Sequence, residues 1–312
     1  MSIVADTEPG SPDIHHAVAV LRAGGLVGMP TETVYGLAGD ARNETAIRRI
    51  FAAKGRPADH PLIVHLADHD HIEQWAMPLN DAARLLANAC WPGPLTLLLR
   101  RHPTVLDVVT GGRDTVGIRI PAHPVAHQLL RSFGGGLAAP SANRFGGVSP
   151  TSADHVRSDL GEQVDCILDG GHCPIGVEST IVDCSTDMPQ ILRPGGIPTE
   201  DIVAILGGHV HASSSGPSRA PGMLESHYAP RCAVMLAPDL DEANTMLATL
   251  SGATLIDGTH DLVAYAHNLY ALLRNADAAG ATAIVAVMPP PVGLGHAIRD
   301  RLMKAAAARP QQ

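Results

Sequence analysis

Residues 61–66 read PLIVHL, and residues 115–120 read TVGIRI. Each run has the length and the apolar composition of one buried strand. Comparable runs occur at residues 26–30, 95–99, 136–139, 166–168 and 179–183. Segments with helical spacing of apolar residues lie among them, at 15–23, 43–53, 81–89, 125–132, 152–160 and 200–206. This alternation predicts an α/β fold, in which helices pack against a twisted sheet that is mixed or mostly parallel.

The composition agrees with that fold class. Of the 312 residues, 45% are hydrophobic but only 3% are aromatic, so the core must consist mainly of Ala, Val, Leu and Ile. This mixture, with 31 glycines, suits an α/β protein better than an all-β sandwich. The length allows one large domain or two ordinary ones.

A second α/β pattern begins after a break in the chain. Residues 207–221 are rich in Gly, Ser and Pro, which is typical of a linker. Beyond them, strand patterns at 232–236, 254–256 and 283–288 alternate with helical patterns at 240–250, 262–276 and 295–308. We therefore expect three parts: a catalytic domain at 12–206, a linker at 207–230 that closes over the active site, and a smaller, Rossmann-like α/β domain at 231–312.

Several features indicate a cytoplasmic protein. The N-terminus, MSIVADTEPG, has neither the basic start nor the apolar core of a secretory signal. No apolar run is long enough to cross a bilayer. The five cysteines are odd in number and none is in a C-x-x-C pair, which favours reduced thiols over a disulfide or zinc framework. No tight metal-binding spacing of histidines occurs, so we expect no metal held by the protein.

The formal net charge is −9. Binding to a nucleic-acid duplex needs clustered Lys and Arg, so this charge argues against strong direct nucleic-acid binding. A local pocket with a few cations can nevertheless hold a nucleotide inside an acidic protein.

Lys54 and Arg56 are the first candidates for such a pocket. They stand at the end of a predicted helix, in the sequence KGRP. Two cations at a helix C-terminus could simply complement the helix dipole. Alternatively, an ammonium and a guanidinium side by side form a phosphate clamp, and the rigid sequence leading into a buried strand favours that interpretation.

Arg119 and His65 interrupt the two strands quoted first. In TVGIRI, alternation places Val116 and Ile118 on one face and Arg119 on the other. A buried arginine needs an anion, which could be either a structural carboxylate or the carboxylate or phosphate of a ligand. His65 could likewise be a satisfied core histidine or a partner of a substrate hydroxyl or carboxylate.

Polar clusters follow three other predicted strands. They are PTETVYGL at 30–37, PSAN at 140–143 and GVESTIVD at 176–183. Each could be ordinary turn chemistry, but ligands of α/β sheets bind at such strand ends. Neither a Walker sequence nor a dinucleotide fingerprint is present, so a bound nucleotide would be held by another scheme.

These motifs occur in a characteristic order: PTETVYGL, KGRPADHPLIVHL, WPGPLTLLL, VGIRIP, APSANRFGGVSPT, GVESTIVD and ILRPGGI. In this order the chain resembles the YrdC-like family of L-threonylcarbamoyladenylate synthases, continuously over about residues 14–205. The segments APGMLESHYAP at 220–230 and GLGHAIRDRLMKAA at 293–306 are similar to the long form of that family.

The resemblance implies a YrdC-like twisted mixed sheet with a concave face, and a reaction. L-threonine, bicarbonate and ATP would give threonylcarbamoyl-AMP, pyrophosphate and water. Mg²⁺ would be bound through the ATP phosphates. A downstream complex would then transfer the threonylcarbamoyl group to adenosine 37 of tRNA.

The resemblance also assigns residues. The threonine pocket would use Thr33, His65, Arg119, the backbone of Ala139, and Ser179. The nucleotide would be held by Lys54, Arg56, His60, Thr115, Ser141, Asn143, Ser149 and Arg193, with Tyr228 closing over it. Lys54 and Arg56 would stabilise charge when the carbamate of threonine attacks the α-phosphorus.

Two alternatives stay open at the level of sequence. One is an RNA-binding or ribosome-maturation module, against which the net charge and the scarcity of aromatic residues for base stacking both count. The other is an enzyme on the same fold that uses a different amine or carbamoyl donor.

Overall fold

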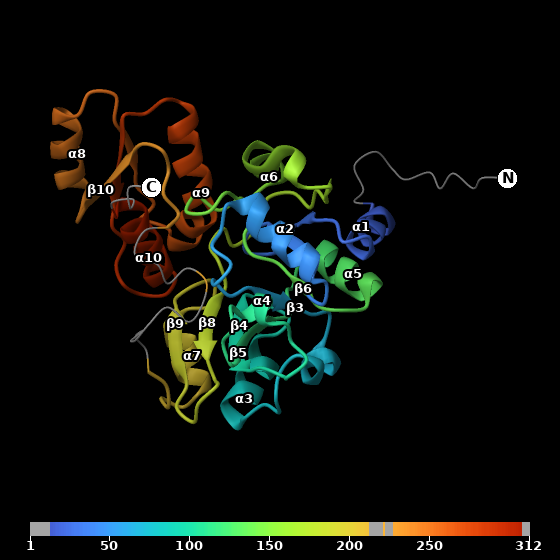
Figure 1. Ribbon diagram of the computed structural model, residues 1–312. Helices are drawn as coiled ribbons and strands as arrows, with labels where there is room; N and C mark the ends of the chain where they lie inside the picture. Colours follow the sequence, from blue (N-terminus) through green and yellow to red (C-terminus); the bar gives the residue numbers. More distant parts are fainter. Residues whose placement is uncertain (1–12, 212–220, 222–226, 308–312) are drawn as a thin grey trace.

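The computed structural model describes residues 13–211, 221 and 227–307. The expected tail at 1–12 and most of the expected linker at 207–230 lie outside these residues. The described chain forms a larger unit, which ends near residue 211, and a smaller C-terminal unit. Figure 1 shows the smaller unit in orange and red beside the larger one.

The larger unit contains seven α-helices and two 3₁₀ helices among the described residues. They are α1 (Ile14–Arg22), α2 (Glu44–Lys54), η1 (His69–Gln74), α3 (Asp81–Cys90), α4 (Asp107–Thr110), α5 (Pro124–Phe133), α6 (Ala153–Leu160), η2 (Gly161–Gln163) and α7 (Thr199–Ile205). Its strands are β1 (Val27–Met29), β2 (Gly36–Asp40), β3 (Ile63–His65), β4 (Leu95–Arg100), β5 (Thr115–Arg119), β6 (Leu137–Ala138), β7 (Cys166–Ile167), β8 (Thr180–Asp183) and β9 (Gln190–Arg193).

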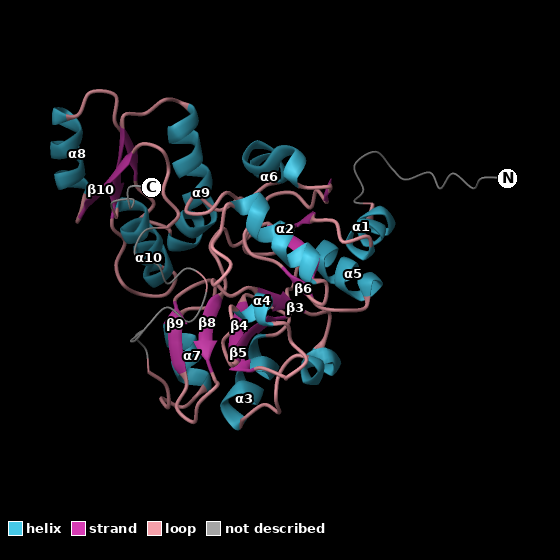
Figure 2. Cartoon of the chain, viewed as in Figure 1, coloured by secondary structure: helices cyan, strands magenta, loops and turns pink. Residues whose placement is uncertain are grey.

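These strands form one mixed sheet in the order β7-β1-β2-β6-β3-β5-β4-β8-β9. The pairs β1/β7, β3/β5 and β4/β8 are parallel, and the remaining pairs are antiparallel. The α/β class with a large mixed sheet and flanking helices is therefore confirmed (Figure 2).

The two strands quoted first lie side by side at the centre of this sheet. In the parallel register, Ile63 pairs with Gly117 and His65 pairs with Arg119. The predicted faces are correct, because Val64 and Ile118 belong to the main hydrophobic core whereas Ile63 belongs to a separate small cluster on the other face.

The main core fills one face of the sheet, where side chains from α2, α3, α4, α6 and α7 pack against β3, β4 and β5. A second core lies under α1 and α5, which pack against β1, β2 and β6. On the second face of β3, β5, β4 and β8, the apolar cluster is limited to Ile63, Leu98, Ile181 and Leu192. The polar candidates His65, Arg119 and Ser179 therefore lie on a face with little apolar covering.

The C-terminal unit alternates strands and helices as its sequence pattern predicts. It consists of β10 (Ala233–Ala237), α8 (Leu240–Thr249), β11 (Thr254–Ile256), α9 (Leu262–Ala278), β12 (Ala283–Val287) and α10 (Gly295–Ala306). The sheet is parallel throughout, in the order β10-β12-β11. The third strand is central, whereas the second strand is central in one half of a Rossmann fold, so the Rossmann likeness lies in the βαβ pattern and not in the strand order.

Two strands of the large sheet, β2 and β9, lie outside the strands that the sequence pattern indicates. In β2, the sequence GLAGD contains two glycines, which are poor strand formers. There is little room for a side chain at either position, because a Cβ at Gly36 would stand 3.1 Å from the Cβ of Ala139, and one at Gly39 would stand 3.1 Å from Cδ1 of Ile50.

Two sequence expectations can be compared with the described residues. No helix in these ranges is both long and apolar enough to span a bilayer. All five cysteines are free, as the absence of C-x-x-C pairs predicts.

Candidate functional site

Lys54 joins the KGR and SAN motifs. Its ammonium nitrogen donates to the carbonyl oxygen of Ser141 at 2.5 Å and to that of Asn143 at 2.6 Å. The side chain is only 3% exposed. Both carbonyls are neutral acceptors, so these two hydrogen bonds do not neutralise the positive charge of Lys54.

The end of α2 fixes where these cations stand. Asn43 caps the start of the helix by accepting from the backbone of Thr45 and Ala46. Gly55 ends it in the left-handed conformation, with φ of 62°. Arg56 then turns back, donates from Nη2 to the carbonyl of Pro61 at 2.9 Å and lies over the ring of Phe145.

The pKa values of both cations are lowered, so their charged forms are disfavoured in this position. Burial, and then the neighbouring charge of Arg56, hold the pKa of Lys54 well below its ordinary value. Burial lowers the pKa of Arg56 to about 10. An anion placed between them would relieve both shifts, since an opposite charge favours the protonated forms.

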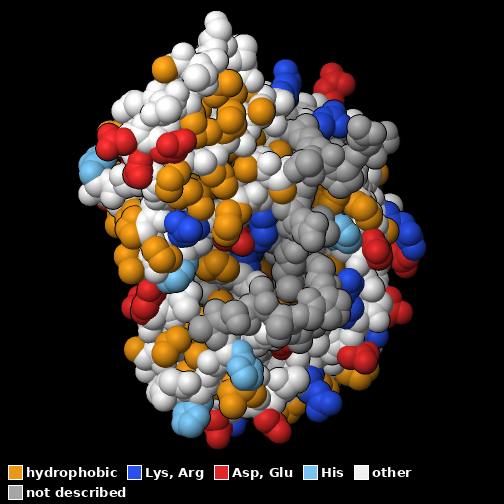
Figure 3. Space-filling model, turned by 90° about the vertical axis from the view of Figure 1, so that its left-hand side faces the viewer, with side chains coloured by type: hydrophobic (Ala, Val, Ile, Leu, Met, Phe, Trp, Pro, Cys, Tyr) orange, Lys and Arg blue, Asp and Glu red, His pale blue; other side chains and the backbone are white. Residues whose placement is uncertain are grey.

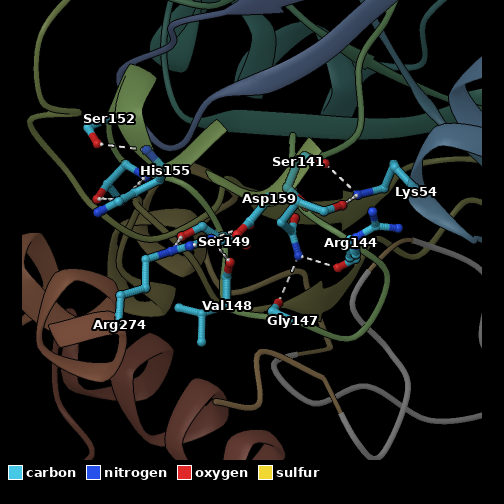
Figure 4. A network of polar contacts seen from close by, with 12 residues as sticks. Lys54, Ser141, Arg144, Gly147, Val148, Ser149, Ser152, His155, Asp159 and Arg274 are labelled. Carbon is cyan, nitrogen blue, oxygen red and sulfur yellow. Dashed lines mark hydrogen bonds and ion pairs between the residues drawn. The ribbon is translucent and has the colours of Figure 1, made fainter. Parts of the chain in front are cut away.

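The loop after Ser141 carries two further candidates. Asn143 holds the loop by donating from Nδ2 to the carbonyls of Arg144 and Gly147, both at 2.8 Å. Its Oδ1 is buried and has no partner. Ser149 is fully buried and donates its hydroxyl to Glu178 at 2.6 Å. Figure 4 shows Lys54 beside Ser141 on one side of this loop and Arg274 on the other.

The buried Arg119 has a structural carboxylate partner. Its Nη2 donates to Oε1 of Glu32 at 2.7 Å, and both side chains are nearly fully buried. The second carboxylate oxygen of Glu32 accepts from the backbone of Ala122. The Nε of Arg119 nevertheless has no partner, so the guanidinium keeps a donor for a second anion.

His65 and Thr33 flank this ion pair. His65 is adjacent to Arg119 in the sheet, and burial followed by the charge of Arg119 lowers its pKa to about 3, so the imidazole is neutral. Thr33 is fully buried, and its hydroxyl lies 2.9 Å from that of Thr31. The backbone N–H of Ala139 donates to Ile63.

Ser179 immediately precedes β8 and is contacted by the side chain of Arg193 of β9. Its hydroxyl is 2.8 Å from that of Thr96. Arg193 donates to the carbonyl of Ser179 from Nη2 at 2.8 Å and from Nε at 3.2 Å, and its Nη1 reaches the carbonyl of Pro221. Arg193 therefore connects the two antiparallel strands with a described residue of the expected linker.

Tyr228 lies at the other end of that linker. The side chain is 1% exposed, its hydroxyl has no partner, and its φ of 61° is left-handed. Its ring stacks on Tyr270 of α9 and lies under the guanidinium of Arg301 of α10. The next residue, Ala229, donates to the carbonyl of Gly146 in the loop after Asn143.

His60 and Thr115 are the two remaining candidates for nucleotide binding. The ring centroid of His60 is 5.3 Å from that of Phe145, next to Arg56, and its pKa is lowered by burial. Thr115 begins β5, where it pairs with Arg100 of β4. Both residues, like Ser141, are only partly buried.

Two functional carboxylates are missing from the sequence prediction. Glu32 belongs to PTETVYGL and Glu178 to GVESTIVD, so both polar clusters were identified but not these members of them. Burial alone would raise the pKa of Glu178, but the charges of Arg301 and Arg193 and hydrogen bonds from Ser149 and Arg301 lower it to about 2. The signal in the sequence is a single acid within a polar cluster next to a buried strand.

Six buried side-chain atoms in the described residues have no hydrogen-bond partner. They are Nε of Arg56, Nε of Arg119, Oδ1 of Asn143, Nδ1 of His227, Oη of Tyr228 and Nη2 of Arg301. Five of them belong to residues described above, the sixth to His227, which precedes Tyr228, and three of the six are guanidinium donors. Buried donors of this kind require acceptors. Fold and side chains together therefore indicate an α/β protein with a buried, cationic group that is a candidate ligand site.

Comparison with known proteins agrees with this class. Residues 19–195 match the Sua5/YciO/YrdC family model, which carries the description "Telomere recombination". Residues 197–307 match a model described as "Threonylcarbamoyl-AMP synthase, C-terminal domain". The chain therefore belongs to the Sua5/YciO/YrdC family, which confirms the resemblance found in the sequence.

Individual relatives cover almost the whole chain. A threonylcarbamoyl-AMP synthase of Pyrococcus abyssi is 41% identical over 95% of this chain and 94% of its own length. The corresponding protein of Bacillus subtilis is 39% identical, over 99% and 97% respectively. A crystal structure of P. abyssi Sua5 complexed with L-threonine superposes with a TM-score of 0.87 at 40% identity, covering 94% of both chains.

Proposed function

We propose that this chain is a threonylcarbamoyl-AMP synthase, a nucleotidyltransferase that condenses L-threonine, bicarbonate and ATP into threonylcarbamoyl-AMP, pyrophosphate and water. The observation that carries the proposal is the contact of Lys54 with the SAN loop, together with the pairing of His65 with Arg119 in the sheet. The names of the P. abyssi and B. subtilis relatives support the same activity.

The threonine half would consist of Thr33, His65, Arg119, Ala139 and Ser179. Arg119 would bind the amino-acid carboxylate through its uncommitted Nε while Glu32 retains Nη2. A neutral His65 can donate to or accept from the substrate hydroxyl without adding a second positive charge. The relative crystallised with L-threonine supports an amino acid of this size.

The nucleotide half would consist of Lys54, Arg56, His60, Thr115, Ser141, Asn143, Ser149 and Arg193, with Tyr228 closing over it. Lys54 and Arg56 would bind the phosphates, which supply the anion that both cations lack. The described ends of the expected linker reach this half through Pro221, which accepts from Arg193, and Ala229, which donates to Gly146. These contacts support a linker that closes over the site.

In the proposed mechanism the protein forms no covalent intermediate. The amine of threonine and bicarbonate give a carbamate with loss of water. A carbamate oxygen attacks the α-phosphorus, and the bond to pyrophosphate breaks. Lys54 and Arg56 stabilise the negative charge that develops at the phosphates, and positioning of two small substrates against ATP supplies much of the remaining acceleration.

We propose that Mg²⁺ binds together with ATP, through its phosphates. The described residues contain no group of three His, Cys, Asp or Glu side chains that could hold a metal ion. Mg²⁺ commonly binds through substrate phosphates and retains several waters, so a site of this kind fits that mode. When bound, it would neutralise phosphate charge.

The product would pass to a complex that transfers the threonylcarbamoyl group to adenosine 37 of tRNA. An acyl-adenylate is hydrolysed readily in water, so burial of the site would protect it. We expect both steps to take place in the cytoplasm.

A pyrophosphate-release assay tests the proposal. We expect release that requires L-threonine, bicarbonate and ATP together, and much slower release when serine or glycine replaces threonine. Release that continues without an amino acid, or an equal rate with glycine, would overturn the assignment.

The alternative of an RNA-binding module predicts a basic surface. Figure 3 shows one face of the molecule, on which Lys and Arg side chains are interspersed with Asp and Glu. The two cations of the proposed phosphate site, Lys54 and Arg56, are buried and therefore suit a small ligand better than a nucleic-acid duplex. Filter binding with duplex RNA at moderate salt distinguishes the two functions.

A further inference from the structure

Glu178 connects the two units of the molecule. It lies just before β8 in the larger unit and is 7% exposed. Its Oε1 accepts from the hydroxyl of Ser149 at 2.6 Å, and its Oε2 accepts from the hydroxyl of Tyr270 at 2.7 Å and from Nε of Arg301 at 2.7 Å. Tyr270 and Arg301 come from α9 and α10 of the C-terminal unit, so that unit supplies two of the three side chains on this carboxylate.

The ionisation of Glu178 decides what Ser149 can do. With a pKa of about 2, the carboxyl group is ionised at neutral pH and can only accept hydrogen bonds. Ser149 has one hydroxyl proton, and that proton is directed at Glu178. The Ser149 oxygen therefore retains lone pairs but no proton for a ligand. Phosphate oxygens are acceptors as well, so they would be repelled by it.

Arg274 of α9 contacts the backbone of Ser149. It forms an ion pair with Asp159 of α6, with Nη1 3.0 Å from Oδ1 and Nη2 2.5 Å from Oδ2. It also donates to the carbonyl oxygens of Val148 and Ser149. Figure 4 shows Arg274 reaching from its helix to this group. The C-terminal unit thus fixes both the main chain and the hydroxyl direction of Ser149.

We propose that Tyr270, Arg301 and Arg274 are positioning residues for the nucleotide half of the site. Acting through Glu178 and the 148–149 backbone, they orient Ser149 so that its oxygen accepts a hydrogen bond from a donor group of the nucleotide, either a ribose hydroxyl or the amino group of the base. The inference rests on the proposed function, since it specifies how the nucleotide of that reaction is held.

Tyr270→Phe tests the positioning role, and Tyr265→Phe is its matched control. Both tyrosines are buried on α9, and each donates one hydrogen bond, Tyr270 to Glu178 and Tyr265 to the carbonyl of Val287 within the C-terminal unit. We expect Tyr270→Phe to raise the KM for ATP about tenfold, the scale of one lost hydrogen bond to a charged group, with the KM for threonine nearly unchanged. We expect Tyr265→Phe to leave both constants near those of the wild type.

Arg274 offers a second variant with a conservative rescue. Arg274→Gln should raise the KM for ATP, and Arg274→Lys should restore part of the loss because the pairing with Asp159 survives. If Tyr270→Phe and Tyr265→Phe have the same KM values for both substrates, the positioning role is wrong. It is equally wrong if the KM for threonine rises as much as that for ATP.

Nucleotide analogues test the direction of the Ser149 hydrogen bond. ATP is compared with 2′-deoxyATP, 3′-deoxyATP and purine riboside triphosphate, which each lack one donor. We expect the wild type to disfavour one analogue about tenfold in kcat/KM, and Ser149→Ala to remove most of that preference. If Ser149→Ala slows all four nucleotides equally, Ser149 does not accept from these donors. A wild type that releases no threonine-dependent pyrophosphate refutes the proposed function instead.

Discussion

The ammonium nitrogen of Lys54 lies 2.5 Å from the carbonyl oxygen of Ser141, which is 87 residues further along the chain. This contact brings two short motifs together, although neither motif alone indicates more than an anion site. The carbonyl groups that bind Lys54 there are neutral, so they do not neutralise the charge that it offers to a phosphate.

Removal of that charge should act on the chemical step. We expect Lys54→Ala to lower the rate of pyrophosphate release at least about 100-fold, the scale of one lost charge-stabilising group. The matched control is Arg48→Ala on the same helix, where the side chain is 64% exposed and pairs with Glu44. We expect near-normal turnover in the control. Near-normal turnover in Lys54→Ala as well would remove Lys54 from the catalytic machinery.

Arg119 can be tested for two roles: structural pairing with the buried carboxylate of Glu32, and binding of the threonine carboxylate. Arg119→Met leaves Glu32 as a buried, unpaired carboxylate, so we expect a loss of about 3–5 kcal/mol in the free energy of unfolding. The double variant Arg119→Met with Glu32→Gln removes both charges and should recover most of that stability. Urea denaturation measures the recovery.

The activity of the same double variant separates the two roles. If Arg119 binds the threonine carboxylate, threonine-dependent pyrophosphate release stays low even though stability returns. Full activity in the stable double variant would show instead that Arg119 is only a structural partner of Glu32.

Most of the central sheet could be predicted from sequence because its strands are apolar runs with period-two alternation. The faces of PLIVHL and TVGIRI follow from that period alone, whereas the juxtaposition of His65 with Arg119 depends on the parallel pairing and register of the two strands, which the period does not give. Strand β2 could not be predicted, since its glycines lie in tight contact with Ala139 and Ile50, of which Ala139 is far away in sequence.

In the site, too, some features could be predicted from sequence and others could not. Lys54, Arg56, Arg119 and Ser149 stand in motifs that local chemistry or resemblance identifies. The dependence of Ser149 on Tyr270 and Arg301 could not be predicted, because it joins positions 92 and 123 residues from Glu178 across two units. No local pattern in α9 or α10 indicates that these side chains point at another unit.

His227 should make the described end of the linker sensitive to acid. Burial, and then the charges of Arg56, Lys54 and Arg193 against the opposing effect of Glu178, lower its pKa from 6.5 to about 3. Between these values the unfolded chain binds one more proton than the folded chain. Stability is therefore unaffected above about pH 6.5 and falls as the pH drops toward about 3, by up to ~1.4 kcal/mol per pH unit.

Thermal unfolding at pH 7.5, 6 and 5, values that cover roughly the upper part of that titration window, measures this dependence. We expect a shallower loss of melting temperature in His227→Gln than in the wild type. His209→Gln, at an exposed position, is the control and should follow the wild type. Parallel curves for all three proteins would contradict a buried, neutral His227.

Gly176 should be indispensable for the contact between the two units. It has a φ of 81°, and a Cβ built on it would stand 2.4 Å from the carbonyl oxygen of His267 and 2.5 Å from that of Ala266, both on α9. Gly171→Ala is the matched control, because this glycine has a φ of 78° but nothing within 4 Å of its added Cβ. Both substitutions carry the left-handed backbone cost of about 1–2 kcal/mol, whereas only Gly176→Ala pushes on α9.

We therefore expect Gly171→Ala to lower stability modestly and to leave the kinetics unchanged. Gly176→Ala should lower stability further and raise the KM for ATP, because displacement of α9 moves Tyr270 and Arg274 away from Glu178 and the 148–149 backbone. Urea denaturation and pyrophosphate release measure the two effects on the same preparations. Equal stability and equal KM values in the two variants would show that the larger unit holds its nucleotide half in place without support from α9.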